Sequence, residues 1–148
     1  MLLSQIHFSM DANTLGETER IVSESDLVQL KACVHLPTVT PQQRAMVETL
    51  ETTAVLVSPE QIPPDVVTMN TTIECTVVDS ANAYHWTLVY PDKADYLMGC
   101  LSVLSPAGIS LLGARCGQTV VCRPPSGAQI LYVIKAILLQ PESRHLAQ

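Results

Sequence analysis

The sequence predicts an α+β protein, in which a short antiparallel helical hairpin precedes a mainly antiparallel five-stranded sheet that carries one short helix. Three observations lead to this class. Apolar residues recur every three or four positions in the first part of the chain and every second position afterwards. The stretch PEQIPPDVV, with three prolines, lies where the period changes. The ten prolines among 148 residues also disfavour an all-helical bundle.

The first predicted helix begins near Ser23 and ends near His35. Residues 1–22 show no clear period, and we expect them to form a loosely ordered arm. Ser23 can cap the helix, and Pro37 prevents it from continuing. The apolar residues of this helix, spaced by three and four positions, are Leu27, Leu30 and Val34.

The second predicted helix spans residues 41–57. Thr40 can cap it, and Gln43 can complete a capping box. Pro41 suits the first helical position, because the N–H that proline lacks has no intrahelical partner there. The expected apolar face consists of Met46, Val47, Leu50, Ala54 and Val57. Two helices joined by so short a link are expected to form an antiparallel hairpin, which we assign to residues 23–62.

Residues 63–148 are expected to form the sheet domain. The predicted strands are TTIECTVVD at 71–79, YHWTLVY at 84–90, CLSVLS at 100–105, QTVVCRP at 118–124 and ILYVIKAIL at 130–138. The first two form a hairpin across the turn sequence DSAN. The last strand is apolar on both faces, which predicts a strand covered on both sides. Ser105 can cap a short helix over residues 106–113 that Gly113 ends.

The charge balance disfavours a protein that binds nucleic acid through its phosphates. The formal net charge is −6, and residues 1–64 hold eight acidic side chains against three basic ones. Domains that neutralise phosphates are normally basic, so we expect no direct, sequence-specific binding of nucleic acid. The acidic first part either faces a basic surface of a partner or forms ordinary solvated helix faces.

The cysteines and the first residues indicate a reduced, cytoplasmic protein. The five cysteines are odd in number and form no CxxC pair. The stretch MLLSQIHFSMDA lacks the basic start of a signal peptide, and no apolar run reaches the length of a membrane span. We therefore expect a cytoplasmic protein with no membrane partner.

The sequence contains no catalytic constellation, so no enzyme, metal or cofactor is predicted. The four histidines are scattered without the spacing of metal ligands, and no glycine loop fits a phosphate. Cys116 follows Arg115 and could be a reactive thiol, but no histidine is placed to serve as its base. A turn cysteine without special reactivity is the simpler interpretation.

Several motifs in the second part of the chain occur in a characteristic order. They are Ser105-Pro106, Leu111-Leu112-Gly113, Gly117 and Pro125-Ser126-Gly127. This order resembles the C-terminal domain of the GreA/GreB transcription factors, which has an FKBP-like fold. The stretches SPEQIPPDVVTMN and TLVYP resemble the short-armed branch of that family, the regulator of nucleoside diphosphate kinase. The resemblance extends from about residue 25 to residue 138.

The resemblance implies an RNA polymerase-binding transcription elongation regulator. In Gre factors the corner after the third strand docks at the rim of the polymerase secondary channel, which here corresponds to Leu104, Ser105, Pro106 and Ala107. Pro106 is expected to preset the first helical turn, and Ser105 to cap it while pointing its hydroxyl outward. Leu104 stands where the family has a polar or acidic residue, and it would add an apolar contact if it lay on the exposed side. Gln118 replaces the aspartate that usually follows the turn glycine.

The expected hairpin tip consists of Pro37, Thr38, Val39, Thr40 and Pro41. Gre factors that stimulate transcript cleavage carry acidic residues at the tip of a long coiled coil, where they hold a second magnesium ion. Hard cations need carboxylate oxygens, and this short hairpin has none at its tip. We therefore expect no cleavage activity, with an active cleavage factor as the alternative that the tip argues against.

A peptidyl-prolyl isomerase is the second alternative, because the FKBP-like fold is shared with those enzymes. Such a pocket needs a dense aromatic lining. The chain has one phenylalanine, one tryptophan and four tyrosines, which is a small supply for that purpose.

Overall fold

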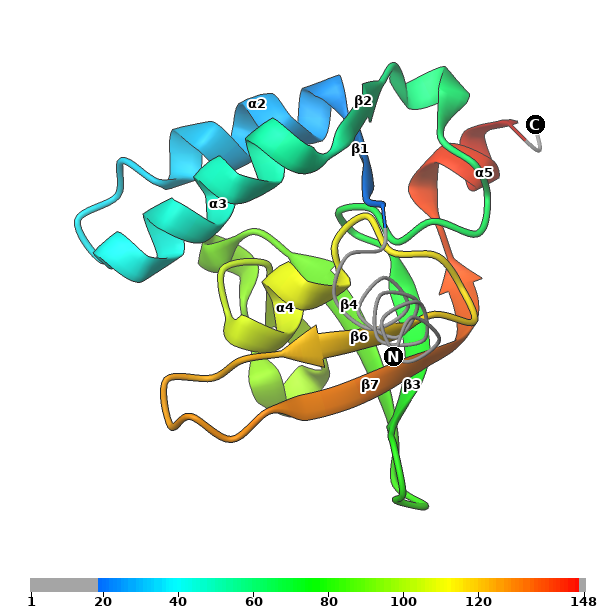
Figure 1. Cartoon of the computed structure of the whole chain (residues 1–148). Helices are drawn as coiled ribbons and strands as arrows, with labels where there is room; N and C mark the ends of the chain where they lie inside the picture. The colour runs from blue at the N-terminus through cyan, green and yellow to red at the C-terminus, as the bar shows by residue number, and fades with distance from the viewer. Residues whose placement is uncertain (1–18, 147–148) are drawn as a thin grey trace, which may run out of the picture.

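A computed structural model describes residues 19–146 (Figure 1). The predicted arm falls largely on residues 1–18, which lie outside the described residues. A first strand, β1 (Ile21–Ser23), begins inside the range assigned to that arm, and all three of its residues are buried.

The predicted helical hairpin is present and consists of α2 (Glu24–Cys33) and α3 (Pro41–Thr53). The Ser23 side chain caps α2 by accepting a 3.1 Å hydrogen bond from the Asp26 N–H. Thr40 and Gln43 form the expected reciprocal capping box at the start of α3. Both helix starts could therefore be predicted from the sequence, because their capping side chains accept hydrogen bonds from N–H groups that have no backbone acceptor within the helix.

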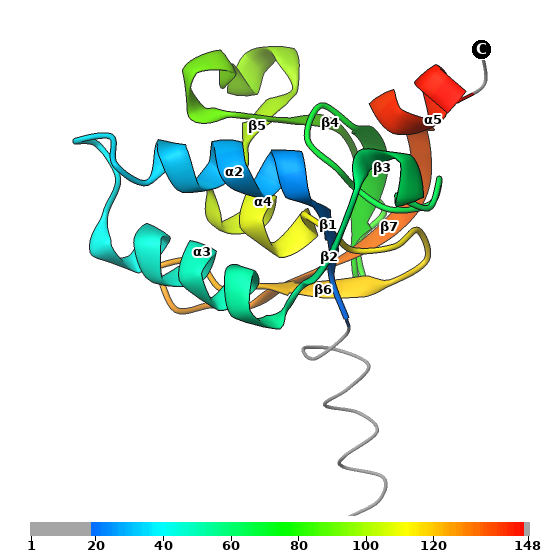
Figure 2. The same cartoon turned by 90° about the horizontal axis from the view of Figure 1, so that it is seen from above.

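The prediction that the second helix continues to residue 57 was wrong. Helix α3 ends at Thr53, and the next residues form strand β2 (Val55–Val57), which pairs with β1 in parallel. The Val55 N–H donates a 2.8 Å hydrogen bond to the Arg20 carbonyl. Pairing with a buried strand therefore replaces the helical bonds that the apolar spacing suggested. Figure 2 shows β1 and β2 together at the base of the hairpin.

The five-stranded sheet has the order β5-β4-β3-β7-β6. Its strands are β3 (Thr72–Val77), β4 (Ala83–Val89), β5 (Cys100–Ser102), β6 (Thr119–Cys122) and β7 (Ile130–Leu139). All neighbouring pairs are antiparallel except β4 and β5, which are parallel. The parallel pairing of β4 and β5 requires the chain to return to the start of β4. It does so through two short 3₁₀ turns, η2 (Pro91–Lys93) and η3 (Tyr96–Met98).

Strand β7 lies between β3 and β6, but it is not covered on both sides as predicted. Tyr132 and Ile134 point into the core, whereas Lys135, Leu138 and Leu139 are exposed. The strand is therefore internal by its hydrogen bonds, but its last residues and Lys135 are exposed, which an apolar sequence alone does not reveal.

Two short helices complete the fold. Helix α4 (Pro106–Leu111) is the predicted short helix, and α5 (Pro141–Leu146) was not predicted. In Figure 1 the hairpin lies over α4, and α4 lies over strands β6 and β7. Within residues 19–146, no helix has the length and apolar character needed to cross a membrane.

One hydrophobic core joins the hairpin to the sheet. It contains Val22, Leu27, Leu30, Val39, Val47 and Leu50 from the first part of the chain. The same cluster contains Trp86, Val103, Leu111, Val120 and Ile134 from the sheet and α4. Burial of these side chains supplies the main stabilising free energy, so the hairpin is packed against the sheet and does not project from it.

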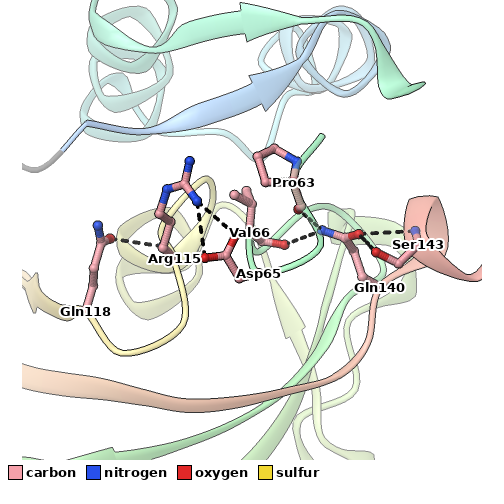
Figure 3. A network of polar contacts seen from close by, with 7 residues as sticks. All are labelled: Pro63, Asp65, Val66, Arg115, Gln118, Gln140 and Ser143. Carbon is pink, nitrogen blue, oxygen red and sulfur yellow. Dashed lines mark hydrogen bonds and ion pairs between the residues drawn. The ribbon is translucent and has the colours of Figure 1, made fainter. Parts of the chain in front are cut away.

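Polar contacts fix the proline-rich junction to the sheet (Figure 3). Arg115 Nη1 lies 2.9 Å from Asp65 Oδ1, and the Arg115 N–H donates to Gln118 Oε1 at 2.9 Å. The buried Gln140 side chain donates to the carbonyl oxygens of Pro63 and Val66, each at 2.8 Å. Gln118, which replaces the aspartate of the Gre pattern, therefore supports the turn with its amide oxygen.

Candidate docking site

The predicted docking corner lies between β5 and α4. Ser105 adopts an extended conformation, and its hydroxyl oxygen accepts a 3.0 Å hydrogen bond from the Gly108 N–H. The same hydroxyl donates a 2.6 Å hydrogen bond to the Ser102 carbonyl. Ser105 therefore caps α4 as expected, but its hydroxyl proton is used inside the corner and does not point outward.

Pro106 and Ala107 form the accessible start of α4. Pro106 occupies the first turn, and both side chains are half-buried. The Ile109 N–H donates to the Ser105 carbonyl at 3.0 Å, which closes the turn. Because the proline ring and the serine cap fix this turn, the corner would lose little conformational entropy on binding.

Leu104 lies inside the protein. Its side chain is 5% exposed and belongs to the core, so it is not available for the apolar contact considered for it. Its carbonyl accepts a 3.0 Å hydrogen bond from Gln43 Nε2, and its N–H donates to Ser102 Oγ at 3.1 Å. Leu104 thus fixes the corner to the core through its buried side chain and to Gln43 and Ser102 through its backbone.

Gly108 is a structural requirement of the corner that the sequence analysis missed. A Cβ atom at this position would lie 2.0 Å from the Ser102 carbonyl oxygen, which is far inside contact distance. Helix α4 can approach β5 so closely only because Gly108 lacks a side chain. A glycine within the first turn of a short helix costs helix propensity, so its presence there was a usable signal.

The hairpin tip exposes Pro37, Thr38, Thr40 and Pro41, whereas Val39 is buried. The Val39 carbonyl accepts a 3.0 Å hydrogen bond from Arg44 Nη1. No acidic residue occurs between residues 34 and 44. The tip therefore presents hydroxyl groups and proline rings but no carboxylate.

The tip lies close to the docking corner. Gln43, in the first turn of α3, reaches Leu104 with its amide nitrogen. The two helices have 10 and 13 residues, and at about 1.5 Å per residue they are only about 15 and 20 Å long. The hairpin is both short and fastened beside the corner.

The remaining reactive side chains are scattered. His85 is exposed, with Nε2 3.7 Å from Glu74 Oε1. Cys116 Sγ lies 3.4 Å from the Lys135 carbonyl oxygen, and all five cysteines are free thiols. In the part of the chain that the structure describes, no group of three or more histidine, cysteine, aspartate or glutamate residues is arranged to hold a metal.

Three aromatic residues gather on the sheet. The rings of Tyr84 and Trp86 stack at 5.0 Å, and those of Trp86 and Tyr132 meet edge to face at 5.4 Å. Trp86 and Tyr132 are buried, and burial raises the pKa of Tyr132 to about 12. The aromatic rings therefore form part of the core.

Comparison with known proteins agrees with this architecture. Residues 62–138 match the family described as "Transcription elongation factor, GreA/GreB, C-term". The "Regulator of nucleoside diphosphate kinase" of Escherichia coli (strain K12) is 36% identical over 90 residues, which are 61% of this chain and 66% of that protein. The "Transcription elongation factor GreA" of Nitratidesulfovibrio vulgaris is 36% identical over 85 residues, which are 57% of this chain and 52% of that protein.

A solved structure has the same fold. The "Prokaryotic transcription elongation factor GreA/GreB from Nitrosomonas europaea" superposes with a TM-score of 0.66 and 31% sequence identity, covering 82% of this chain and 99% of that one. The fold is therefore that of the GreA/GreB class of transcription factors. The family match includes the docking corner and just over half of the residues, and the chain belongs to the GreA/GreB family. The matched segments span less than two thirds of the two relatives named above.

Proposed function

We propose that this protein binds RNA polymerase at the rim of the secondary channel and regulates transcription without stimulating transcript cleavage. It would act in the cytoplasm, where the polymerase works. Ser105, Pro106 and Ala107 form the contact, and Leu104 holds them in place. Membership of the GreA/GreB family supports the choice of partner.

The rigidity of the corner supports its role as the contact. Both hydrogen-bonding functions of the Ser105 hydroxyl are used within the corner, and Pro106 fixes the first turn of α4. A surface that is already in its bound conformation loses less entropy on association than a loop that must become ordered. The accessible atoms of Pro106 and Ala107 are apolar, which suits a partner surface that buries them.

The hydrogen bond between Gln43 and Leu104 is the observation that carries the proposal of no cleavage activity. It fastens the start of α3, and thus the tip, beside the corner that would dock at the rim. A cleavage factor must instead extend its tip from the rim to the polymerase active site. This tip has neither the reach nor the carboxylates to hold magnesium there.

The burial of the aromatic cluster argues against prolyl isomerase activity. A prolyl ring needs an open pocket lined with aromatic side chains, whereas Trp86 and Tyr132 are covered by the core. We expect no acceleration of prolyl isomerisation in a peptide assay. Isomerase activity that is lost in the Trp86→Leu variant would favour that alternative.

Titration of core RNA polymerase with the labelled protein tests the docking proposal. Ala107→Glu places a charge on a half-buried side chain of the corner that also packs against the core, so each variant is first shown to be folded by its unfolding transition. We expect roughly tenfold weaker binding. Ala128→Glu is the matched control, because Ala128 is exposed in the turn between β6 and β7 and is not one of the residues of the corner. Equal affinities of the two folded variants would show that the docking surface lies elsewhere.

A further inference from the structure

A groove lies between α3, α4 and β6, on the side of the hairpin. Its volume is about 620 Å³. Its apolar walls are formed by Met46, Leu50, Pro106, Ile109 and Val121. Pockets that bind small molecules commonly have volumes of about 300–1,000 Å³ with mostly apolar walls and a few polar groups. The groove has the size and the walls of such a site.

Arg20 supplies a cationic group to this groove. It is half-buried immediately before β1, and its Nη2 donates a 3.1 Å hydrogen bond to the Ser110 carbonyl. Its Nη1 is buried and has no hydrogen-bond partner among the described residues. Burial lowers the pKa of the Arg20 guanidinium, because it removes water from around the charge. A buried donor without a partner is uncommon and calls for an explanation.

Arg123 supplies a second cationic group to the same groove. It follows β6 and is exposed. Glu19, also exposed, is the one carboxylate that lines the groove, and within the described chain no carboxylate forms an ion pair with either arginine. Among the described lining residues, two guanidinium groups stand against one carboxylate, which is an excess of positive charge in a protein whose formal net charge is −6.

We propose that this groove binds a small amphipathic anion, a free molecule with one carboxylate, sulfonate or phosphate group on an apolar body. The guanidinium groups of Arg20 and Arg123 would bind the anionic group, since guanidinium donors suit planar and tetrahedral oxyanions. The apolar walls on α3 and α4 would bury the body of the ligand. This site shares Pro106 with the proposed polymerase contact. Its ligand is a small molecule, so it is testable without polymerase.

The methionines of the chain offer a direct readout of the site. Met46 lines the groove, whereas Met98 lies in the exposed apolar turn of Tyr96, Leu97 and Met98. The full chain is labelled at its methionine methyl groups and titrated with anilinonaphthalene sulfonate, a fluorescent anion with an aromatic body. Binding in the groove shifts the Met46 methyl resonance with a saturable dependence on probe concentration. A shift confined to Met98 would overturn the proposal, because it would place the probe on the exposed turn.

Charge variants test the role of the arginines. Arg123→Gln is decisive, because its side chain is exposed and its removal leaves no buried group unpaired. We expect it to weaken binding of anilinonaphthalene sulfonate roughly tenfold, the size of a charge-assisted hydrogen bond. Arg20→Gln should weaken binding at least as much. Lys135→Gln is the matched control, because it removes one exposed positive charge on β7 outside the groove.

A neutral probe separates the anionic group from the apolar body. Phenylnaphthylamine has a similar aromatic body without the sulfonate, and its affinity should be the same in Arg123→Gln as in the unaltered protein. Equal effects of Arg123→Gln and Lys135→Gln on the anionic probe would overturn the proposal, as would the absence of saturable binding at Met46.

Discussion

Gln43 Nε2 donates a 3.0 Å hydrogen bond to the carbonyl oxygen of Leu104. The Oε1 atom of the same side chain accepts a 2.9 Å hydrogen bond from the Thr40 N–H. One amide therefore caps helix α3 and fastens the hairpin tip to the docking corner. The position of the tip relative to the corner depends on this side chain as well as on the shared core.

Removing the Gln43 amide should destabilise the protein. Gln43→Ala loses both side-chain hydrogen bonds and leaves the Leu104 carbonyl without this donor, at a cost of about 1–2 kcal/mol in the free energy of unfolding. Urea denaturation measures the loss. The neighbouring variant Gln42→Ala is the control, because Gln42 is exposed, and it should change stability by less than about 0.5 kcal/mol. Equal stability of the two variants would contradict this account.

A second variant separates the two roles of Gln43. Gln43→Glu keeps an oxygen that accepts from the Thr40 N–H but has no donor for the Leu104 carbonyl. The helix cap should survive, since glutamate also completes a capping box. We expect backbone amide exchange at residues 104–108 to increase while the helicity of α3 is retained. Unchanged exchange at the corner would show that the Gln43 contact does not hold it.

Gly108→Ala should destabilise the protein, although alanine is the better helix former. The added methyl group would meet the Ser102 carbonyl at 2.0 Å, so α4 must move away from β5. Overpacking of this kind costs about 1–3 kcal/mol, against a gain in helix propensity of about 1 kcal/mol. Thermal unfolding of Gly108→Ala and of the control Ala107→Gly tests this. Only the first should also disrupt the packing of Leu104, and a stabilised Gly108→Ala variant would refute the argument.

Much of the fold was predictable because its signals are local. Ser23, Thr40 and Ser105 each accept a hydrogen bond from the backbone three residues later, and the sequence places each before a helical pattern. The end of α3 was not predictable in this way. Residues Val55–Val57 form a strand because they pair with β1, which lies more than thirty residues earlier in the chain. No local pattern contains that partner.

The backbone conformation of the proposed docking corner could be predicted from the sequence, whereas its contacts with the rest of the protein could not. The Ser105-Pro106 pair predicts the cap and the first turn of α4, and the structure has both. The burial of Leu104 depends on the hairpin packing over the corner, and Gln43 reaches it from 61 positions away in the sequence. Tertiary packing of this kind leaves no trace in the spacing of apolar residues.

The Asp26 carboxyl should make stability depend on pH. Burial, and then the nearby Glu142, raise the pKa of Asp26 from 3.8 to about 6, although the Met69 N–H and the Ser23 hydroxyl oppose the shift. The folded state thus holds this proton more tightly than the unfolded state. The stability that this bound proton gives the folded state is fully present below about pH 4. It is lost as the pH rises through about 6.

Asp26→Asn should remove the loss of stability that ionisation of the Asp26 carboxyl causes. The amide oxygen can still accept from the Met69 N–H, which now donates to Asp26 Oδ2 at 3.2 Å. We expect the variant to exceed the unaltered protein in stability at about pH 7 by on the order of 1 kcal/mol, with little difference at about pH 4. Urea denaturation across this range measures it. Glu24→Gln, at an exposed carboxyl in the first turn of α2, controls for the lost helix charge. A stability difference that is constant with pH would contradict the assignment.

Adding carboxylates to the hairpin tip should not create cleavage activity. The double variant Pro37→Asp, Thr38→Glu supplies oxygen ligands for magnesium at two exposed positions. The tip remains close to the corner through Gln43. Under the proposed docking at the rim, we expect this short hairpin not to carry those ligands to the active site. Neither the unaltered protein nor the variant should release short 3′ RNA from a stalled elongation complex, while a cleavage-competent Gre factor in the same assay should.

Magnesium-dependent release by the double variant alone would show that the hairpin reaches the active site and that only the missing carboxylates prevent cleavage. Release by the unaltered protein as well, abolished by substitutions at the tip, would refute the proposed lack of cleavage activity altogether.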